Sequence, residues 1–137
     1  MVETEITRIT TRKHILFFLF QTNFRDEPYG SYLGLYRQMN PELESDIDYF
    51  LKVVNGIATD RRAVDSLYEK FLRNWEVDRL PIVDRVILEI ASFEIVNCDD
   101  IPVSVSINEA VRLAKEYAGD GASSYINGVL SSFEKSL

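Results

Sequence analysis

Three cationic side chains near the start of the sequence are the first residues whose type and spacing suggest a binding site. Arg8 and Arg12 are four residues apart, so on a helix they would share one side, with Lys13 beside them. Guanidinium groups pair with phosphate oxygens, so one interpretation is a patch that contacts nucleic-acid phosphates. The other is a solvated helix face, or a set of salt bridges to nearby acids. The residues alone leave both open.

Tyr125 is the second candidate, because it follows the glycine- and serine-rich residues 119–124 and precedes the last apolar stripe. An aromatic ring at such an edge stacks on a single-stranded base, a contact of about 1–3 kcal/mol. The same ring is equally compatible with the protein core, which the residue type alone favours.

Signals for catalysis and for metal binding are weak. Glu94 and Glu109 are conceivable as an acid–base pair, but glutamates on helices of an acidic protein are more often solvated or structural, and no nucleophile accompanies them. One histidine, His14, and one cysteine, Cys98, cannot make a structural zinc site, and no phosphate-binding glycine loop is present. We expect His14 on a helix surface, and no catalytic residue, metal or cofactor.

Apolar residues recur every three or four positions along most of the chain, which predicts helices to position these side chains. Residues 15–20 alone are also compatible with a buried strand, but no second clear strand is available to pair with them. Asp60 is expected to cap one helix, and Pro81 to open another that is apolar on most sides and therefore central. The expected helices cover residues 7–24, 32–36, 42–58, 60–75, 81–95, 106–118 and 126–137.

The boundaries of the last two helices are predicted from their polar residues. Ser106 followed by Glu109 has the spacing of a capping box, so a helix should begin at Ser106. Gly119 and Gly121 should end it, because glycine readily adopts the left-handed conformation found after helices. The residues up to Ser124 are then expected to form a flexible segment.

Length and composition favour one domain, residues 1–137, with a single core. The lone cysteine excludes an internal disulfide. Without a signal peptide or an apolar run of about 18 residues, we expect a cytoplasmic protein with no membrane span. The net charge of -7 argues against a general nucleic-acid binder. Residues 1–24 alone have a positive balance, with three cations against Glu3 and Glu5.

Ordered motifs run through the second half of the chain. They are Trp75, Arg79-Leu80, Val83-Asp84-Arg85, Ile87-Leu88, Ile90-Ala91, Phe93-Glu94-Ile95, Ile101-Pro102, residues 107–111, residues 113–115 and residues 127–130. Together they resemble the NusB family of bacterial transcription antitermination factors, over about residues 65–133 and more loosely in the first helix. The resemblance implies an all-α fold of about seven helices in two packed bundles.

The resemblance also implies a function. NusB-like proteins pair with NusE, a small-subunit ribosomal protein, and the pair binds the boxA element of nascent RNA. With further Nus factors this makes RNA polymerase resistant to termination, chiefly on ribosomal RNA operons, without catalysis. The implied RNA-binding residues are Arg8, Arg12, Lys13, the polar segment from Asp120 to Ser124, and Tyr125. The implied partner-binding residues are Trp75, Arg79, Asp84 and Arg85.

The N-terminus departs from the family pattern. Where relatives often carry a run of arginines, this chain reads Thr7-Arg8-Ile9-Thr10-Thr11-Arg12. Weaker phosphate contact follows, which keeps open the alternative of a protein-only assembly adaptor. A monomer and a homodimer are both compatible with the resemblance. The length leaves no room for the methyltransferase domain that follows some NusB-like domains, so a stand-alone factor is expected.

Overall fold

The computed structural model describes residues 6–137, so Glu3 and Glu5 lie outside the described residues. Within that range the chain forms helices and no strand, which confirms the predicted all-α class. Three short 3-10 turns cover Pro41–Asp46, Glu69–Phe71 and Val77–Arg79. The α-helices of the described part are α1 (Arg8–Thr22), α2 (Gly30–Met39), α3 (Ile47–Thr59), α4 (Arg61–Tyr68), α5 (Ile82–Asn97), α6 (Val103–Tyr117) and α7 (Asp120–Lys135).

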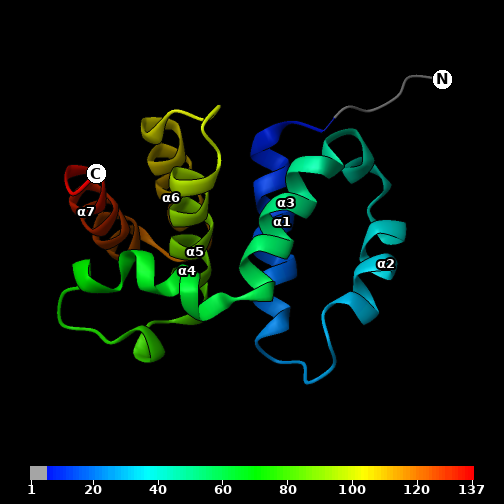
Figure 1. Ribbon diagram of the computed structural model, residues 1–137, viewed down its shortest axis with the longest axis horizontal. Helices are drawn as coiled ribbons and strands as arrows, with labels where there is room; N and C mark the ends of the chain where they lie inside the picture. Colours follow the sequence, from blue (N-terminus) through cyan, green and yellow to red (C-terminus); the bar gives the residue numbers. More distant parts are fainter. Residues whose placement is uncertain (1–5) are drawn as a thin grey trace.

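The helices form two groups that stand side by side, α1 to α3 in one and α4 to α7 in the other (Figure 1). Helix α5 contacts α1 and α3 of the first group as well as α4, α6 and α7 of its own, so it joins the two bundles. Every residue of α5 from Val86 to Glu94 is buried. The expectation that the helix opened by Pro81 is central is therefore confirmed.

The N-terminal bundle is built around the ring of Phe18, which is fully buried in α1. Tyr29, Tyr32, Tyr36 and Phe50 surround it, with ring centroids 5.3–6.4 Å from its own. Most of these pairs meet edge to face, an arrangement that aromatic quadrupoles favour. Residues 15–20 are thus helical, and four of them, Ile15, Leu16, Phe18 and Leu19, are buried in the core.

Two predicted helix starts have different outcomes. Asp60 caps α4 as predicted, since its carboxylate accepts a hydrogen bond from the backbone N–H of Ala63 at 3.2 Å. The capping box at Ser106 is wrong, because α6 already begins at Val103, directly after Pro102. The fixed φ of proline suits that position, and it leaves the Ser106 hydroxyl free to bond elsewhere.

Gly119 makes the sharp turn between α6 and α7. Its φ of 103° and ψ of 168° belong to a region that is essentially restricted to glycine. Its predicted role at the end of α6 is therefore confirmed. Gly121 instead lies in the first turn of α7, so the flexible segment expected up to Ser124 is wrong, and these residues are helical.

Candidate functional site

Arg12, one of the predicted phosphate contacts, points into the protein. Its side chain is almost fully buried, and its Nε and Nη2 donate to the two carboxylate oxygens of Glu94 at 2.8 and 3.0 Å. The hydroxyls of Tyr49 and Ser106 also donate to Glu94. Burial raises the pKa of Tyr49, so its hydroxyl stays protonated as a donor. The structure therefore corrects the placement of Arg12 on an exposed phosphate-binding face.

Arg8 and Lys13 do reach solvent, but each has an acidic partner. Arg8 pairs with Asp46 (Nε–Oδ2 2.8 Å), and its guanidinium lies 3.9 Å from the ring centroid of Tyr49. Lys13 Nζ lies 3.2 Å from Oε1 of Glu116 on α6. Of the two interpretations of these cations, salt bridges to nearby acids are what the structure contains.

The residues considered for catalysis have structural partners instead. Glu94 is held by Arg12, while Glu109 pairs with Arg112 at 3.2 Å. His14 is mostly buried rather than on the surface, with ring nitrogens 2.8 Å from the Tyr36 hydroxyl and 3.0 Å from Glu42. Within residues 6–137, no group of three His, Cys, Asp or Glu side chains is placed to hold a metal.

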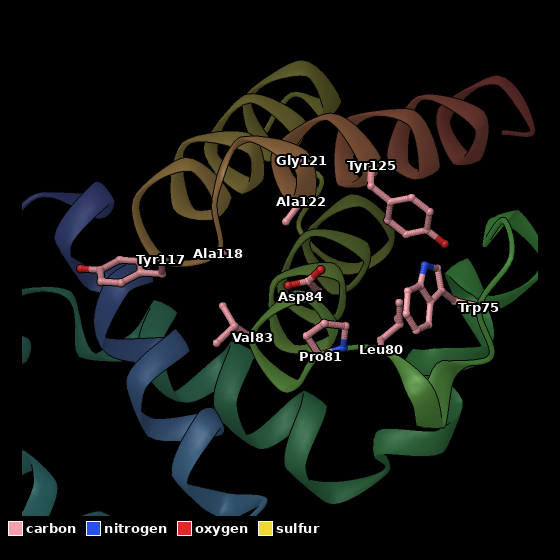
Figure 2. A pocket seen from close by; sticks show the side chains of 10 residues that line it. All are labelled: Trp75, Leu80, Pro81, Val83, Asp84, Tyr117, Ala118, Gly121, Ala122 and Tyr125. Carbon is pink, nitrogen blue, oxygen red and sulfur yellow. The ribbon is translucent and has the colours of Figure 1, made fainter.

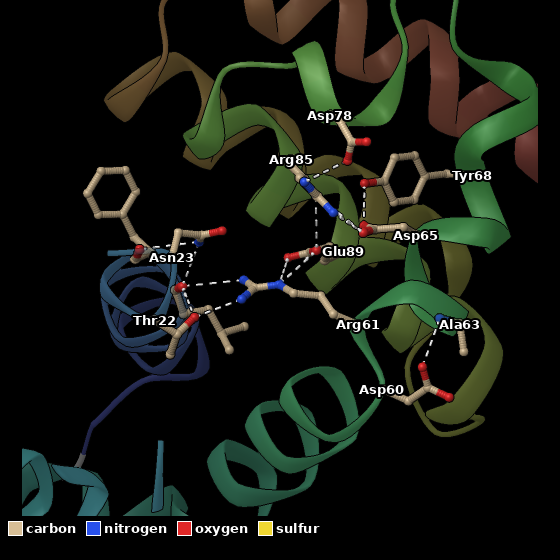
Figure 3. A network of polar contacts seen from close by, with 12 residues as sticks. Thr22, Asn23, Asp60, Arg61, Ala63, Asp65, Tyr68, Asp78, Arg85 and Glu89 are labelled. Carbon is tan, nitrogen blue, oxygen red and sulfur yellow. Dashed lines mark hydrogen bonds and ion pairs between the residues drawn. The ribbon is translucent and has the colours of Figure 1, made fainter. Parts of the chain in front are cut away.

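A second buried acid on α5, Glu89, lies in a network of charges between the bundles (Figure 3). Arg61 Nε bonds to both of its carboxylate oxygens, at 3.1 and 2.9 Å. The same guanidinium donates to the Thr22 hydroxyl at 2.7 Å and to the Leu19 carbonyl at 3.3 Å. Arg61 therefore links the C-terminal end of α1 to α5 at Glu89. The ion pair of Arg12 with Glu94 links the same two helices five residues further along α5.

Arg85, predicted to bind a partner, belongs to this network and is largely used inside the protein. Its Nη2 lies 2.6 Å from Asp65 Oδ2, and its Nη1 lies 3.5 Å from Asp78. Asp65 also accepts a hydrogen bond from the Tyr68 hydroxyl at 2.7 Å (Figure 3). The structure thus corrects the expectation that Arg85 is available to a partner on an open surface.

Glu89 is expected to make stability depend on pH. Its burial, together with nearby Asp65, outweighs the hydrogen bonds from Arg61 and raises its pKa to about 8 in the folded protein. The unfolded chain loses this proton near the ordinary pKa of glutamate, about 4.3. The folded state therefore holds the extra proton between about pH 5 and pH 8, and the stabilisation it gives declines as pH rises through that window.

Glu89→Gln mimics the protonated acid, so its stability should not decline in this window. The difference in free energy of unfolding between Glu89→Gln and wild type should therefore be more favourable to the variant at pH 8.5 than at pH 5.5, by at least about 2 kcal/mol. Urea unfolding at both pH values measures this difference. Glu76→Gln, which changes an exposed acid, should show no such gain. A difference between Glu89→Gln and wild type that stays constant with pH would exclude the raised pKa.

A pocket of about 520 Å³ lies where α5 begins, between the end of α6 and the first turns of α7 (Figure 2). Trp75, Asp84 and Tyr125 all line it, although the resemblance implied a protein partner for the first two and RNA for the third. Arg79 precedes Leu80 of the pocket wall, and its side chain is 78% exposed. Small residues of α6 and α7 complete the wall: Ala118, Gly121 and Ala122.

Asp84 places a largely buried carboxylate in the wall of this pocket, where its own backbone N–H donates to it. Only 8% of the residue is exposed, and its side chain points into the pocket (Figure 2). No other residue in the described part of the chain forms an ion pair or a side-chain hydrogen bond with it. A capping-box contact is excluded, because the N-cap residue Pro81 has no backbone N–H to donate. Burial raises the pKa of Asp84.

Tyr125 is half-buried at the edge of the pocket, and its hydroxyl is fixed by the chain before α5. The hydroxyl accepts from the backbone N–H of Arg73 at 2.9 Å and donates to the backbone carbonyl of Arg73 at 3.0 Å. Asp120 and Ser124 are exposed in the first two turns of α7, on the same helix as Tyr125. The structure brings these three predicted residues together, and it leaves one face of the Tyr125 side chain toward the pocket.

Sequence reasoning missed a row of exposed aromatic side chains along α1 and just beyond its C-terminal end. Phe17, Phe20 and Phe24 are 42%, 36% and 64% exposed, and Tyr117 of α6 is 37% exposed. The rings of Phe17 and Tyr117 meet edge to face, with centroids 5.3 Å apart. We call these four residues the aromatic stripe. The spacing of three and four between Phe17, Phe20 and Phe24 was the available signal in the sequence. It is hidden because the surrounding residues are apolar on every side of the helix.

The aromatic stripe and the pocket form one continuous surface, because Tyr117 belongs to both. The sequence pattern that defines the NusB family matches residues 9–135. This chain belongs to the NusB family. A transcription antitermination protein NusB from Rubrobacter xylanophilus is 36% identical, over 96% of this chain and 93% of that protein. The NusB of Bacillus licheniformis is 37% identical, over 95% of this chain and 98% of that protein.

Solved NusB structures share the fold of this NusB family member. NusB of T. maritima has a TM-score of 0.85 and 29% identity, over 96% of this chain and 93% of that chain. A chain from a crystal structure of NusB and NusE in complex with double-stranded RNA has a TM-score of 0.82 and 25% identity, over 95% of this chain and 97% of that chain. As for membranes, none of the helices in residues 6–137 is long and apolar enough to cross one.

Proposed function

We propose that this protein is a non-catalytic transcription antitermination factor of the cytoplasm. Together with a NusE-like small-subunit ribosomal protein it binds the boxA element of nascent RNA, and within an RNA polymerase complex it promotes reading through terminators in ribosomal RNA operons. The observation that carries this proposal is the surface on which the aromatic stripe meets the Trp75–Tyr125 pocket through Tyr117. It offers adjacent places for a protein partner and for an RNA strand.

The aromatic stripe is the proposed docking surface for the NusE-like protein. Contiguous exposed aromatic residues on a soluble protein mark interaction sites, and aromatic residues are enriched at interface cores. The net charge of -7 also suits a basic ribosomal protein. Arg85 is no longer proposed as a partner contact, because its charge is engaged by Asp65. Trp75 and Arg79 lie at the neighbouring pocket, next to the aromatic stripe.

The RNA role is tested by titrating boxA RNA and a scrambled RNA against the protein, with and without the NusE-like partner, at stated salt. Tight binding of boxA by the complex, with weaker binding of the scrambled RNA, is the expected result. Equal binding of both RNAs would favour the alternative, a protein-only assembly adaptor. One observation favours that alternative: all three N-terminal cations already have acidic partners.

Alanine substitutions separate phosphate contacts from stacking in the same complex. Arg8→Ala and Lys13→Ala should each reduce the salt dependence of boxA affinity by about one phosphate contact. Tyr125→Ala should weaken binding by about 1–3 kcal/mol with an unchanged salt slope, because it removes stacking. Fluorescence anisotropy at several salt concentrations measures both quantities. Unchanged affinity in all three variants would remove the direct RNA role.

A further inference from the structure

The last turn of α1 contains no cation of its own, and Arg61 of α4 supplies one from outside the helix (Figure 3). Its Nη2 donates to the Leu19 carbonyl at 3.3 Å and its Nη1 to the Thr22 hydroxyl at 2.7 Å. A positive charge is favourable here, because the free carbonyl groups at the end of a helix carry partial negative charge. Glu89 accepts from Nε on the other side of the guanidinium. Arg61 therefore fixes the C-terminal turn of α1 against the second bundle.

This turn carries half of the aromatic stripe. Phe20 lies in it, and Phe24 follows directly after the helix, with the two ring centroids 5.1 Å apart. The backbone N–H of Phe24 donates to the Gln21 carbonyl at 3.0 Å, so the chain at Phe24 still follows the turn. The direction of both rings thus depends on the path of the segment that Arg61 holds.

The other half of the stripe is supported from a different direction. The ring of Phe17 meets Tyr117 of α6 edge to face, with centroids 5.3 Å apart. The ion pair of Arg12 with Glu94 also joins α1 to α5, but it lies on the N-terminal side of Phe17. Because the two halves have separate supports, the contribution of Arg61 can be measured by itself.

We propose that Arg61 is a positioning residue of the partner-docking surface, which holds the last turn of α1 so that Phe20 and Phe24 present their rings to the NusE-like protein. The inference rests on the proposed role of the aromatic stripe. Each of the three guanidinium nitrogens of Arg61 donates to a group of this chain, and the side chain is only 22% exposed. Arg61 therefore acts through the turn. Binding side chains need such support, because small displacements of an anchor reduce affinity.

Isothermal titration calorimetry of the full chain with the purified NusE-like protein measures the effect. Arg61→Gln removes the charge and the planar fork, and it should weaken binding about tenfold. Arg61→Lys keeps a charge at the helix end but loses the fork, so it should restore the affinity to within about threefold of wild type. In Arg61→Gln, amide hydrogen exchange should become faster in residues 20–24 and stay unchanged at the start of α1.

Two further variants separate positioning from general stability. Glu94→Gln breaks the other link between α1 and α5, so it should unfold more easily, yet its folded form should bind the partner within about threefold of wild type. Thr22→Val removes one acceptor of Arg61 and keeps the branched shape of the side chain. It should weaken binding about threefold, and it decides the question if Arg61→Gln does not fold.

A double-mutant cycle assigns the effect to the rings. When Phe20 and Phe24 are both replaced by alanine, Arg61→Gln should weaken binding only about twofold or less, because the rings that it positions are absent. When Phe17 alone is replaced by alanine, Arg61→Gln should still weaken binding about tenfold. Circular dichroism checks that each variant remains helical.

The failures of the two proposals can be told apart. Wild-type affinity in folded Arg61→Gln, together with a loss in Phe20→Ala, overturns the positioning role and leaves the docking surface standing. An equal effect of Arg61→Gln in both backgrounds also overturns it, because Arg61 would then act by touching the partner. If the wild-type protein does not bind the partner, or if Phe17→Ala and Phe20→Ala bind it normally, both proposals are wrong.

Discussion

Glu94→Gln is expected to lower the free energy of unfolding by about 3–5 kcal/mol, because it leaves the buried charge of Arg12 without its counter-ion. Arg12→Met should cost a similar amount by leaving the Glu94 carboxylate unpaired. Both side chains are almost fully buried, so water cannot compensate. Urea unfolding at pH 7, followed by far-ultraviolet circular dichroism, measures the loss.

A double variant shows whether the loss comes from the unpaired charge. Arg12→Met combined with Glu94→Leu removes both charges and should recover part of the stability, although the Tyr49 and Ser106 hydroxyls would then lack their acceptor. Glu44→Gln breaks an exposed pair with Arg37 and should change stability little. If Glu94→Gln unfolds at the same urea concentration as wild type, the buried pair does not hold the bundles together.

Truncating residues of the aromatic stripe is expected to weaken binding of the NusE-like partner more than removing any single surface charge does. Phe17→Ala and Phe20→Ala should each cost about 2 kcal/mol or more in binding, a loss of roughly 30-fold in affinity. Both side chains are more than a third exposed, so the fold should survive their truncation. Isothermal titration calorimetry with the purified partner gives the affinity, and circular dichroism checks the helices.

Leu35→Ala and Met39→Ala provide matched controls for this prediction. They also truncate exposed apolar side chains, but on α2, at the outer side of the N-terminal bundle (Figure 1). They should leave partner affinity within about threefold of wild type. Equal losses in the α1 and α2 variants, or no loss in either, would place the partner elsewhere on the protein.

The sequence predicted the architecture well, because helical periodicity is a local property. The central position of α5 was visible from its all-round apolar character, and the cap at Asp60 from one side chain and its spacing. The orientation of Arg12 was not visible. A spacing of four shows that Arg8 and Arg12 share a side of α1, but Glu94, the acid that draws Arg12 inward, lies 82 residues away in the chain.

The site was predicted in its parts and missed as a whole. Tyr125, Trp75 and Asp84 were each singled out, yet only the packing of α5 against α6 and α7 shows that they line one pocket. The start of α6 was misplaced because Ser106 has the residue type and spacing of a cap, while its hydroxyl serves Glu94 instead. Local patterns do not report which distant group a side chain will meet.

The two hydrogen bonds between the Tyr125 hydroxyl and the backbone of Arg73 also affect the rate at which this surface can bind a ligand. A ring already held in one orientation loses little side-chain freedom when a ligand arrives, whereas immobilising a free side chain costs about 0.5–1.5 kcal/mol. Capture then requires no slow rearrangement of this wall. A nascent transcript passes such a site once, so a wall that is in place beforehand favours engagement within the short time that the strand is near.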